Sequence, residues 1–234
     1  RLVDAIAKPQ QFAQVVRERA TALAAQSDRP AGAQGVALPA LKRKVDADRL
    51  IYDHVTVDID RAKRTATFTV KAPDSAQPTD IAGIEAAGAA WWPLQMAREL
   101  DDAILNMRTN ELDTGTWVLK TSGDPKAVLA ADATLLAHKD HWLVRETIGH
   151  LRRTLARMDV TSRSLFALVE EGTCFVGTLA ELAFCADRAY MLALPDDEAK
   201  APKIQLNEMN FGFFPMVNDQ TRLQRRFYEE VPAM

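Results

Sequence analysis

The sequence predicts an α/β domain in which a mostly parallel β-sheet is covered by helices. Two observations support this prediction. Short runs of β-branched and apolar residues recur along the chain, and longer runs with apolar residues at helical spacing lie between them. Strands that alternate with helices in this way are joined by βαβ crossovers, which produce parallel strands.

The composition indicates a globular chain and argues against two kinds of partner. With 234 residues, 47% of them hydrophobic, the chain can bury a sizeable core. Its net charge of -3 lacks the basic character of a nucleic-acid-binding domain. No apolar run approaches the roughly 20 residues that cross a bilayer, and the first residues lack the order of a signal peptide. We therefore expect no nucleic-acid or membrane partner and a cytoplasmic location.

Three segments of the chain differ in composition. Residues 1–26 end in a run with apolar residues at helical spacing and are predicted to be the tail of a preceding unit. Residues 27–45 are rich in Pro, Gly and Ala, which is typical of a linker. Residues 46–234 form the main domain, which we expect to be truncated at its C-terminus.

The first half of the main domain is predicted to contain a β-hairpin and two long helices. The hairpin follows from two alternating runs joined by a charged turn, and the helices follow from apolar residues that recur on one side. In order, these elements are strands at 52–59 and 65–71, a helix at 90–110, a strand at 117–121 and a helix at 140–158.

The second half is predicted to alternate strands and helices. Apolar strand-like runs there are separated by a glycine turn, a small-residue helix and an acidic loop. In order, the elements are a strand at 164–170, a helix after Gly172, strands at 187–194 and 204–210, and a basic helix at 218–230.

Two glutamates in low-polarity surroundings are the candidates for chemistry. Glu181 lies in an otherwise apolar helix just after a glycine turn, and Glu208 lies in an apolar strand-like run. Unpaired amide N–H groups at a helix start suit a developing oxyanion, and an apolar setting raises a carboxyl pKa toward neutrality. A glutamate on such a helix is also commonly exposed or paired with an arginine, so a structural role is the alternative.

The cysteines and histidines indicate neither a disulfide framework nor a metal site. Cys174 and Cys185 lack the spacing of zinc ligands and are expected to be small buried thiols. No further ligand stands at a recognisable spacing from His138, His141 and His150, which we expect to be solvated or to cap helices. The sequence therefore predicts no metal.

Two motifs carry a resemblance to a known family. The chain reads GTLAELAFCAD at 177–187, which contains Glu181, and NEMNFGFFP at 207–215, which contains Glu208; TRL follows at 221–223. These runs resemble the crotonase (enoyl-CoA hydratase/isomerase) superfamily over residues 50–230. The resemblance implies a crotonase-like fold and a CoA-thioester substrate, with CoA present as part of the substrate and no other cofactor.

The resemblance also implies a reaction and a role for each site residue. The chain is most similar to members that open an aromatic-derived ring, such as that of 2,3-epoxybenzoyl-CoA or benzoyl-CoA dihydrodiol, by carbon–carbon cleavage with loss of formate. Glu181 and Glu208 would be the catalytic carboxylates, and the amides of Thr178 and Ala130 would bind the thioester oxygen. Such members resemble two crotonase-like units in tandem, so residues 1–26 would end the first unit. We then expect the main domain to pack on that upstream unit, in a homo-oligomer.

Three departures from the family pattern leave alternatives open. Thr178 stands where the family has a glycine, the run around Ala130 lacks its glycine, and Asn207 replaces a proline. Side chains at the first two positions crowd the approach that glycine leaves open. The alternatives are a hydratase or isomerase of aliphatic enoyl-CoA, and a non-catalytic unit that supports an active site elsewhere in a longer protein.

Overall fold

The computed structural model describes residues 2–29, 32–197 and 200–228. The chain divides into two compact units, residues 1–36 and 37–234. The first unit contains helix α1 (Pro9–Ala24), which begins with proline at its first position and buries none of its side chains. The unit boundary falls inside the segment 27–45, and residues 37–45 of that segment belong to the second unit, where Lys44–Val45 forms a strand.

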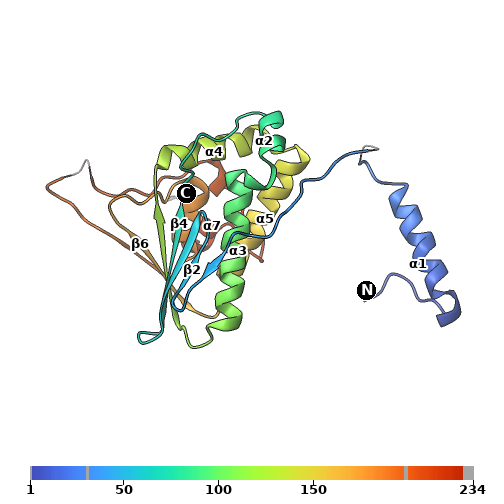
Figure 1. Cartoon of the computed structure of the whole chain (residues 1–234), viewed down its shortest axis with the longest axis horizontal. Helices are drawn as coiled ribbons and strands as arrows, with labels where there is room; N and C mark the ends of the chain where they lie inside the picture. Colours follow the sequence, from blue (N-terminus) through green and yellow to red (C-terminus); the bar gives the residue numbers. More distant parts are fainter. Residues whose placement is uncertain (1, 30–31, 198–199, 229–234) are drawn as a thin grey trace. The chain divides into compact units, whose positions relative to one another are not determined.

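The second unit is built on a mixed β-sheet with the strands in chain order (Figure 1). The strands β1 to β4 pair antiparallel, and β4 to β7 pair parallel. The predicted α/β class and the predicted hairpin are therefore confirmed. The strands are β1 (Lys44–Val45), β2 (Arg49–Ile51), β3 (Val55–Asp60), β4 (Thr65–Lys71), β5 (Thr116–Ser122), β6 (Ser164–Val169) and β7 (Arg188–Met191).

Helices connect the parallel strands, and the two longest, α3 and α5, pack against each other. Both were predicted from their apolar periodicity, and α3 begins at a Trp-Pro pair that fixes its first turn. The α-helices are α2 (Ile81–Ala87), α3 (Trp92–Asn110), α4 (Pro125–Ala137), α5 (Trp142–Asp159), α6 (Ala180–Cys185) and α7 (Arg222–Arg226). The short 3₁₀ helices are η1 (Gly88–Ala90), η2 (Gly177–Leu179) and η3 (Glu208–Asn210).

The core lies between the sheet and these helices. Alternate residues of β3 to β6 are buried, and Phe68 on β4 contacts Trp117 on β5 with their ring centroids 4.7 Å apart. Trp91 and Trp92 are fully buried, and the indole of Trp92 donates to the carbonyl of Lys71 at the end of β4. Both tryptophans are therefore core residues.

Two predictions for the last third of the chain are wrong. Residues 204–210 were expected to form a strand, but they make a single bridge, from Gln205 to Val176, and then turn into η3. The reason is local: the Asn207 side chain accepts the N–H of Met209, and the Asn210 side chain accepts the N–H of Asn207.

The basic helix predicted at 218–230 is the shorter α7. The Thr221 side chain caps its first turn by accepting the N–H of Gln224, whose own side chain accepts the N–H of Thr221. Residues 229 and 230 of that prediction lie outside the described residues.

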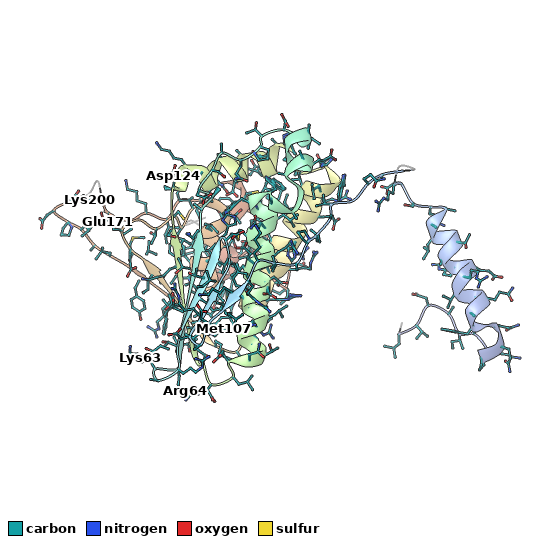
Figure 2. The ribbon with its side chains drawn as sticks, in the orientation of Figure 1. Lys63, Arg64, Met107, Asp124, Glu171 and Lys200 are labelled. Atoms are coloured by element: carbon teal, nitrogen blue, oxygen red, sulfur yellow. The ribbon has the colours of Figure 1, made fainter. Side chains whose placement is uncertain are left out.

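The two ends of the sheet differ in what they present. Asp124 and Glu171 mark the end at which β5 and β6 finish, and Lys63 and Arg64 mark the hairpin turn at the opposite end (Figure 2). In open α/β sheets, ligands bind at the carboxyl ends of parallel strands. Across the described part of the chain, no helix is both long and apolar enough to traverse a bilayer.

Candidate functional site

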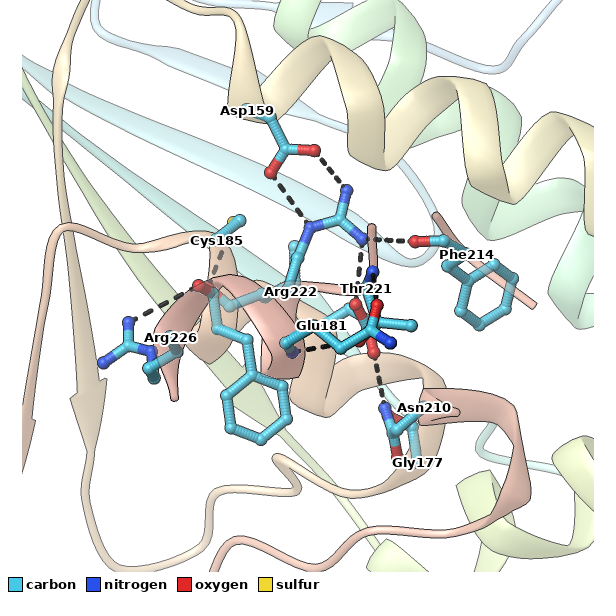
Figure 3. A network of polar contacts seen from close by, with 12 residues as sticks. Asp159, Gly177, Glu181, Cys185, Asn210, Phe214, Thr221, Arg222 and Arg226 are labelled. Carbon is cyan, nitrogen blue, oxygen red and sulfur yellow. Dashed lines mark hydrogen bonds and ion pairs between the residues drawn. The ribbon is translucent and has the colours of Figure 1, made fainter. Parts of the chain in front are cut away.

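Glu181 lies on the short helix α6, buried in the interior with 2% of its surface exposed. One carboxylate oxygen accepts from Nδ2 of Asn210 at 2.7 Å, and the other accepts from Nη1 of Arg222 at 2.8 Å (Figure 3). The glutamate is therefore buried as predicted, but a cation and an amide surround its carboxylate. Glu181 is therefore paired with an arginine, which is the structural role given above as the alternative to catalysis.

Arg222 on α7 holds two buried carboxylates at once. Its Nε donates to Asp159 at 2.9 Å, its Nη2 donates to the second oxygen of the same carboxylate, and its Nη1 reaches both Glu181 and the carbonyl of Phe214. The fork of guanidinium donors suits this bidentate contact with Asp159. Arg222 thus ties the end of α5 to α6, and Asn210 extends the network to the carbonyl of Gly177 in η2.

Burial dominates the ionisation of this network. It raises the pKa of Glu181, which the charge of Arg222 and the hydrogen bond from Asn210 oppose. It also raises the pKa of Asp159, again against Arg222. For Arg222 burial acts in the lowering direction, but the two carboxylates outweigh it and the net pKa is raised. Arg222 therefore stays charged, and its charge is shared between two acids.

Glu208 is not in low-polarity surroundings, so that prediction is wrong. It is exposed at the first position of η3, and no side-chain hydrogen bond or ion pair of Glu208 is found among the described residues. The residue of that turn that reaches Glu181 is Asn210, because the η3 turn directs Asn210 inward and Glu208 outward. The two predicted carboxylates are therefore not brought together.

Thr178 lies in η2, where a buried aspartate engages its backbone amide. Its N–H donates to Oδ2 of Asp132 on α4 at 2.8 Å, and its hydroxyl donates to Oδ1. The Nδ2 group of Asn207 donates to Oδ2 as well, at 2.8 Å. Three donors from two separate segments therefore converge on one carboxylate, and a substrate oxygen would have to displace Asp132 to reach the Thr178 amide.

Asp132 is fully buried, and no cation is found among its contacts in the described part of the chain. Burial raises its pKa to about 6, although the hydrogen bonds from Thr178 and Asn207 act in the opposite direction. The three donors replace the hydration that the carboxylate loses, which is how a buried carboxylate is retained without an ion pair.

Gly177 allows the side chains of Asp132 and Asn207 to lie close to the backbone of η2. Its φ is +49°, in the left-handed region, and a Cβ atom there would lie 1.9 Å from Oδ2 of Asp132 and 2.5 Å from Nδ2 of Asn207. Only glycine allows both the backbone conformation and the contact. The glycine at the start of the motif therefore serves the contact between Asp132 and η2.

Ala130 lies in the interior of α4, five residues after the helix begins. Amides beyond the first turn of an α-helix donate within the helix, so this N–H is not offered to a ligand. Its carbonyl accepts from the hydroxyl of Thr134. The pair of amides assigned to the thioester oxygen, at Thr178 and Ala130, is thus engaged by other groups in this structure.

A cavity of about 460 Å³ opens at the carboxyl ends of β4 and β5. Its walls are the loop from Lys71 to Ala76 and the turn from Ser122 to Asp124 that leads into α4. Gly123, at φ +116°, lets this turn pass against Ala72. The loops after these strands are where an α/β sheet of this kind binds ligands, and sequence reasoning missed the loop from Lys71.

The residues that hold the site together were also missed, with one partial exception. Asp159 is the last residue of α5, one position beyond the predicted helix, and Asp132 lies in α4, for which no helix was predicted. Asp132 is two residues from the candidate Ala130, but no role was assigned to it. Arg222 was within the quoted TRL run, although no role was assigned to it. No group of three or more His, Cys, Asp or Glu side chains in the described ranges is arranged to hold a metal.

Structural comparison finds enoyl-CoA hydratases. The structure of one from Geobacillus kaustophilus is 18% identical and matches 80% of this chain and 61% of its own, with a TM-score of 0.49. An enoyl-CoA hydratase/isomerase from Marinobacter aquaeolei is 15% identical, matches 58% and 48% of the two chains, and has a TM-score of 0.38. At such scores the likeness carries no argument, so the fold rests on the sheet and helices described above.

Sequence comparison is more decisive. No protein-family model matches the chain. Benzoyl-CoA-dihydrodiol lyase from Aromatoleum evansii is 58% identical over 231 residues, which is 98% of this chain and 41% of that protein. The chain therefore spans about two fifths of the length of this curated relative. Identity at this level over nearly the whole chain shows common descent with a part of benzoyl-CoA-dihydrodiol lyase.

Proposed function

We propose that this chain is part of a carbon–carbon lyase that acts on an aromatic-derived CoA thioester. The observation that carries the proposal is the 58% identity to benzoyl-CoA-dihydrodiol lyase across 98% of the chain. The substrate would be 2,3-epoxybenzoyl-CoA or benzoyl-CoA dihydrodiol, and hydrolytic cleavage of the ring would release formate. Water supplies the atoms that this cleavage needs, so the proposal includes no cofactor beyond the CoA of the substrate.

The cavity at the ends of β4 and β5 is our candidate for the CoA moiety. Lys71, Ser75 and Ser122 line it, and the first turn of α4 lies at its edge. The lysine and the hydroxyl groups suit phosphate oxygens. The first turn of α4 is capped by the carboxylate of Asp124, which accepts the N–H of Lys126 and also lines the cavity, as does Asp74. The cavity also has apolar walls, from Ala72, Ala76 and others, against which a ring system can pack.

The geometry around η2 favours a second candidate role within the same enzyme. The Thr178 amide is engaged by Asp132, and both oxygens of Glu181 are engaged by Asn210 and Arg222. Groups that are fully hydrogen-bonded within the protein are poorly placed to bind an oxyanion or to transfer a proton. In this reading the chain supports an active site formed by the rest of the longer protein.

Two substitutions in the complete protein distinguish these roles. Glu181→Gln and Glu208→Gln would be assayed for formate release from 2,3-epoxybenzoyl-CoA, with urea unfolding measured in parallel. Catalytic carboxylates predict a fall in kcat of about 10²-fold or more at each position. If the chain is a supporting unit, Glu208→Gln should keep full activity. Glu181→Gln should then change the free energy of unfolding but keep its activity under conditions in which the protein is folded.

The same assay tests the lyase proposal itself. If the unmodified complete protein releases no formate from this substrate, the lyase proposal fails whichever carboxylates matter. Hydration of crotonyl-CoA in its place would favour the aliphatic enoyl-CoA hydratase reading.

The partners and location follow from the proposed reaction. We expect a CoA-thioester substrate, an upstream crotonase-like unit against which this one packs, and a homo-oligomeric assembly. We also expect a cytoplasmic location, because CoA thioesters are intracellular metabolites. The two cysteines, Cys174 and Cys185, are free thiols, which suits a reducing compartment.

A further inference from the structure

The sheet of the second unit has helices on one face and an open face on the other. The side chains of β4 to β6 that are buried alternate with half-buried or exposed ones, so the pattern along each strand is one-sided. In Figure 1, α3 and α5 lie together on one side of the strands. The strands β4 to β7 pair parallel, and parallel strands are usually covered on both faces.

Toward β7 this open face becomes apolar. On β4 this face presents Thr65, Thr67 and Thr69. On the next three strands it presents the apolar Val118, Phe166, Leu168 and Tyr190, flanked by polar side chains of the same face: Thr116, Lys120, Ser164 and Arg188. The strand register places Val118 beside Phe166 and Leu168 beside Tyr190. We call these four residues, together with Leu192, the apolar sheet patch.

Two aromatic side chains form the centre of the apolar sheet patch. The rings of Phe166 and Tyr190 lie edge to face with centroids 6.1 Å apart, and Tyr190 is 54% exposed. The ion pair of Lys120 and Glu170 lies on the same part of the sheet, at 2.6 Å. An apolar, aromatic centre with a charged rim is the usual anatomy of a protein–protein interface.

The strand β7 is itself uncovered. All four of its residues are exposed, so its opposite face, with Met191 at 51%, is open as well. No strand among the described residues pairs with its outer edge. Proteins normally cover or blunt an apolar sheet edge, because a bare one pairs with other chains.

The length of the relative indicates what covers this surface. This chain matches 41% of the curated lyase, so most of that polypeptide lies outside the region compared here. A segment joined covalently has an effective concentration of about millimolar, well above that of a separate partner.

We infer that the apolar sheet patch and the edge of β7 are the surface on which the remainder of the longer lyase polypeptide packs. The inference rests on the proposal that this chain is part of such a protein. It adds the location of the contact, since it assigns the docking surface to the end of the sheet formed by β5, β6 and β7.

Site-specific photo-cross-linking in the complete protein tests the inference. Benzoylphenylalanine would replace Tyr190 in one variant and Phe166 in a second. Phe211, which is 57% exposed outside the patch, is the matched aromatic control. Each variant is first required to unfold at the same urea concentration as the parent, and cross-linked peptides are mapped by mass spectrometry.

We expect positions 190 and 166 to cross-link within one chain, to polypeptide outside the segment described here, about ten-fold more than position 211, independently of protein concentration. Cross-links that join two chains and double the mass on a denaturing gel would overturn the inference in favour of a second copy. Equal yields at 190 and 211 would overturn it too. Because the readout needs no turnover, absence of lyase activity is seen separately from absence of the contact.

Discussion

The carboxylate of Asp132 accepts the backbone amide of Thr178 at 2.8 Å, and so occupies the donor that the family resemblance assigns to a thioester oxygen. An aspartate of the chain thus takes the position of a bound oxyanion. The hydroxyl of Thr178, which a glycine would lack, adds a second hydrogen bond to the same carboxylate. The threonine at position 178, where the family has glycine, therefore stabilises the arrangement in which Asp132 accepts from the Thr178 amide.

The first prediction separates the charge of Asp132 from its hydrogen bonds. In Asp132→Asn the amide oxygen can accept from Thr178 N–H and Asn207, while its NH₂ faces a threonine hydroxyl that can rotate to accept. In Asp132→Ala three buried donors lose their acceptor, at about 1–3 kcal/mol each. At pH 4, where the native carboxyl is protonated, we expect Asp132→Ala to lower the free energy of unfolding by about 3 kcal/mol or more, and Asp132→Asn to lower it little. Equal losses in urea unfolding would contradict this account.

The second prediction concerns pH. The folded pKa of Asp132, about 6, lies above its ordinary value of 3.8, so the native state binds the proton more tightly than the unfolded state. The contribution of this group to stability is then greatest below pH 4, falls as pH rises toward 6, and is constant above. Asp132→Asn removes this slope. The free energy of unfolding of Asp132→Asn, relative to that of the parent, should rise by about 3 kcal/mol between pH 4 and pH 7. If this difference does not change with pH, the raised pKa of Asp132 is wrong.

A pair of glycines tests the close approach at η2. Gly177→Ala would place a methyl group against Asp132 Oδ2 and Asn207, whereas Gly172, also at positive φ (+78°), has no atom within 4 Å of the corresponding position. We expect Gly172→Ala to cost about 1 kcal/mol, from backbone conformation alone. Gly177→Ala should cost about 3 kcal/mol or more, because strain adds to that term. Similar melting temperatures for the two variants would show that the contact is not constraining.

The last prediction concerns Arg222. Replacement by Met leaves Glu181 and Asp159 buried without their cation, and breaking a buried pair in this way costs about 3–5 kcal/mol. Arg225→Met, three residues along α7 and exposed, is the control and should change stability by no more than about 0.5 kcal/mol.

The pH dependence of the Arg222 variant is a second readout. Because burial raises the pKa of both Glu181 and Asp159, these acids take up protons more readily once the cation is gone. The loss in Arg222→Met should therefore shrink as pH falls and grow toward neutral pH. A loss that is independent of pH would indicate that packing of the side chain, and not its charge, is what matters.

Several features of the fold could be predicted from sequence because they depend on local periodicity. The hairpin of β3 and β4, the helices α3 and α5 and the strands β5 and β6 all follow from apolar spacing of 2 or 3.6. The prediction of a strand at 204–210 relied on the same apolar periodicity and was wrong. The apolar residues of this segment suggest a strand, but Asn207 and Asn210 hydrogen-bond to the backbone and turn the chain into η3.

By itself the sequence determined the α/β class, the burial of Glu181 and the similarity of the chain to part of a benzoyl-CoA-dihydrodiol lyase, because periodicities and short motifs encode these. The tertiary structure alone decided what the buried groups do. Asp132 and Thr178 are 46 residues apart, Glu181 and Arg222 are 41, and Arg222 and Asp159 are 63. A carboxylate becomes a proton carrier or a structural anchor according to the donors that surround it, and here those donors arrive from distant segments that only the folded chain brings together.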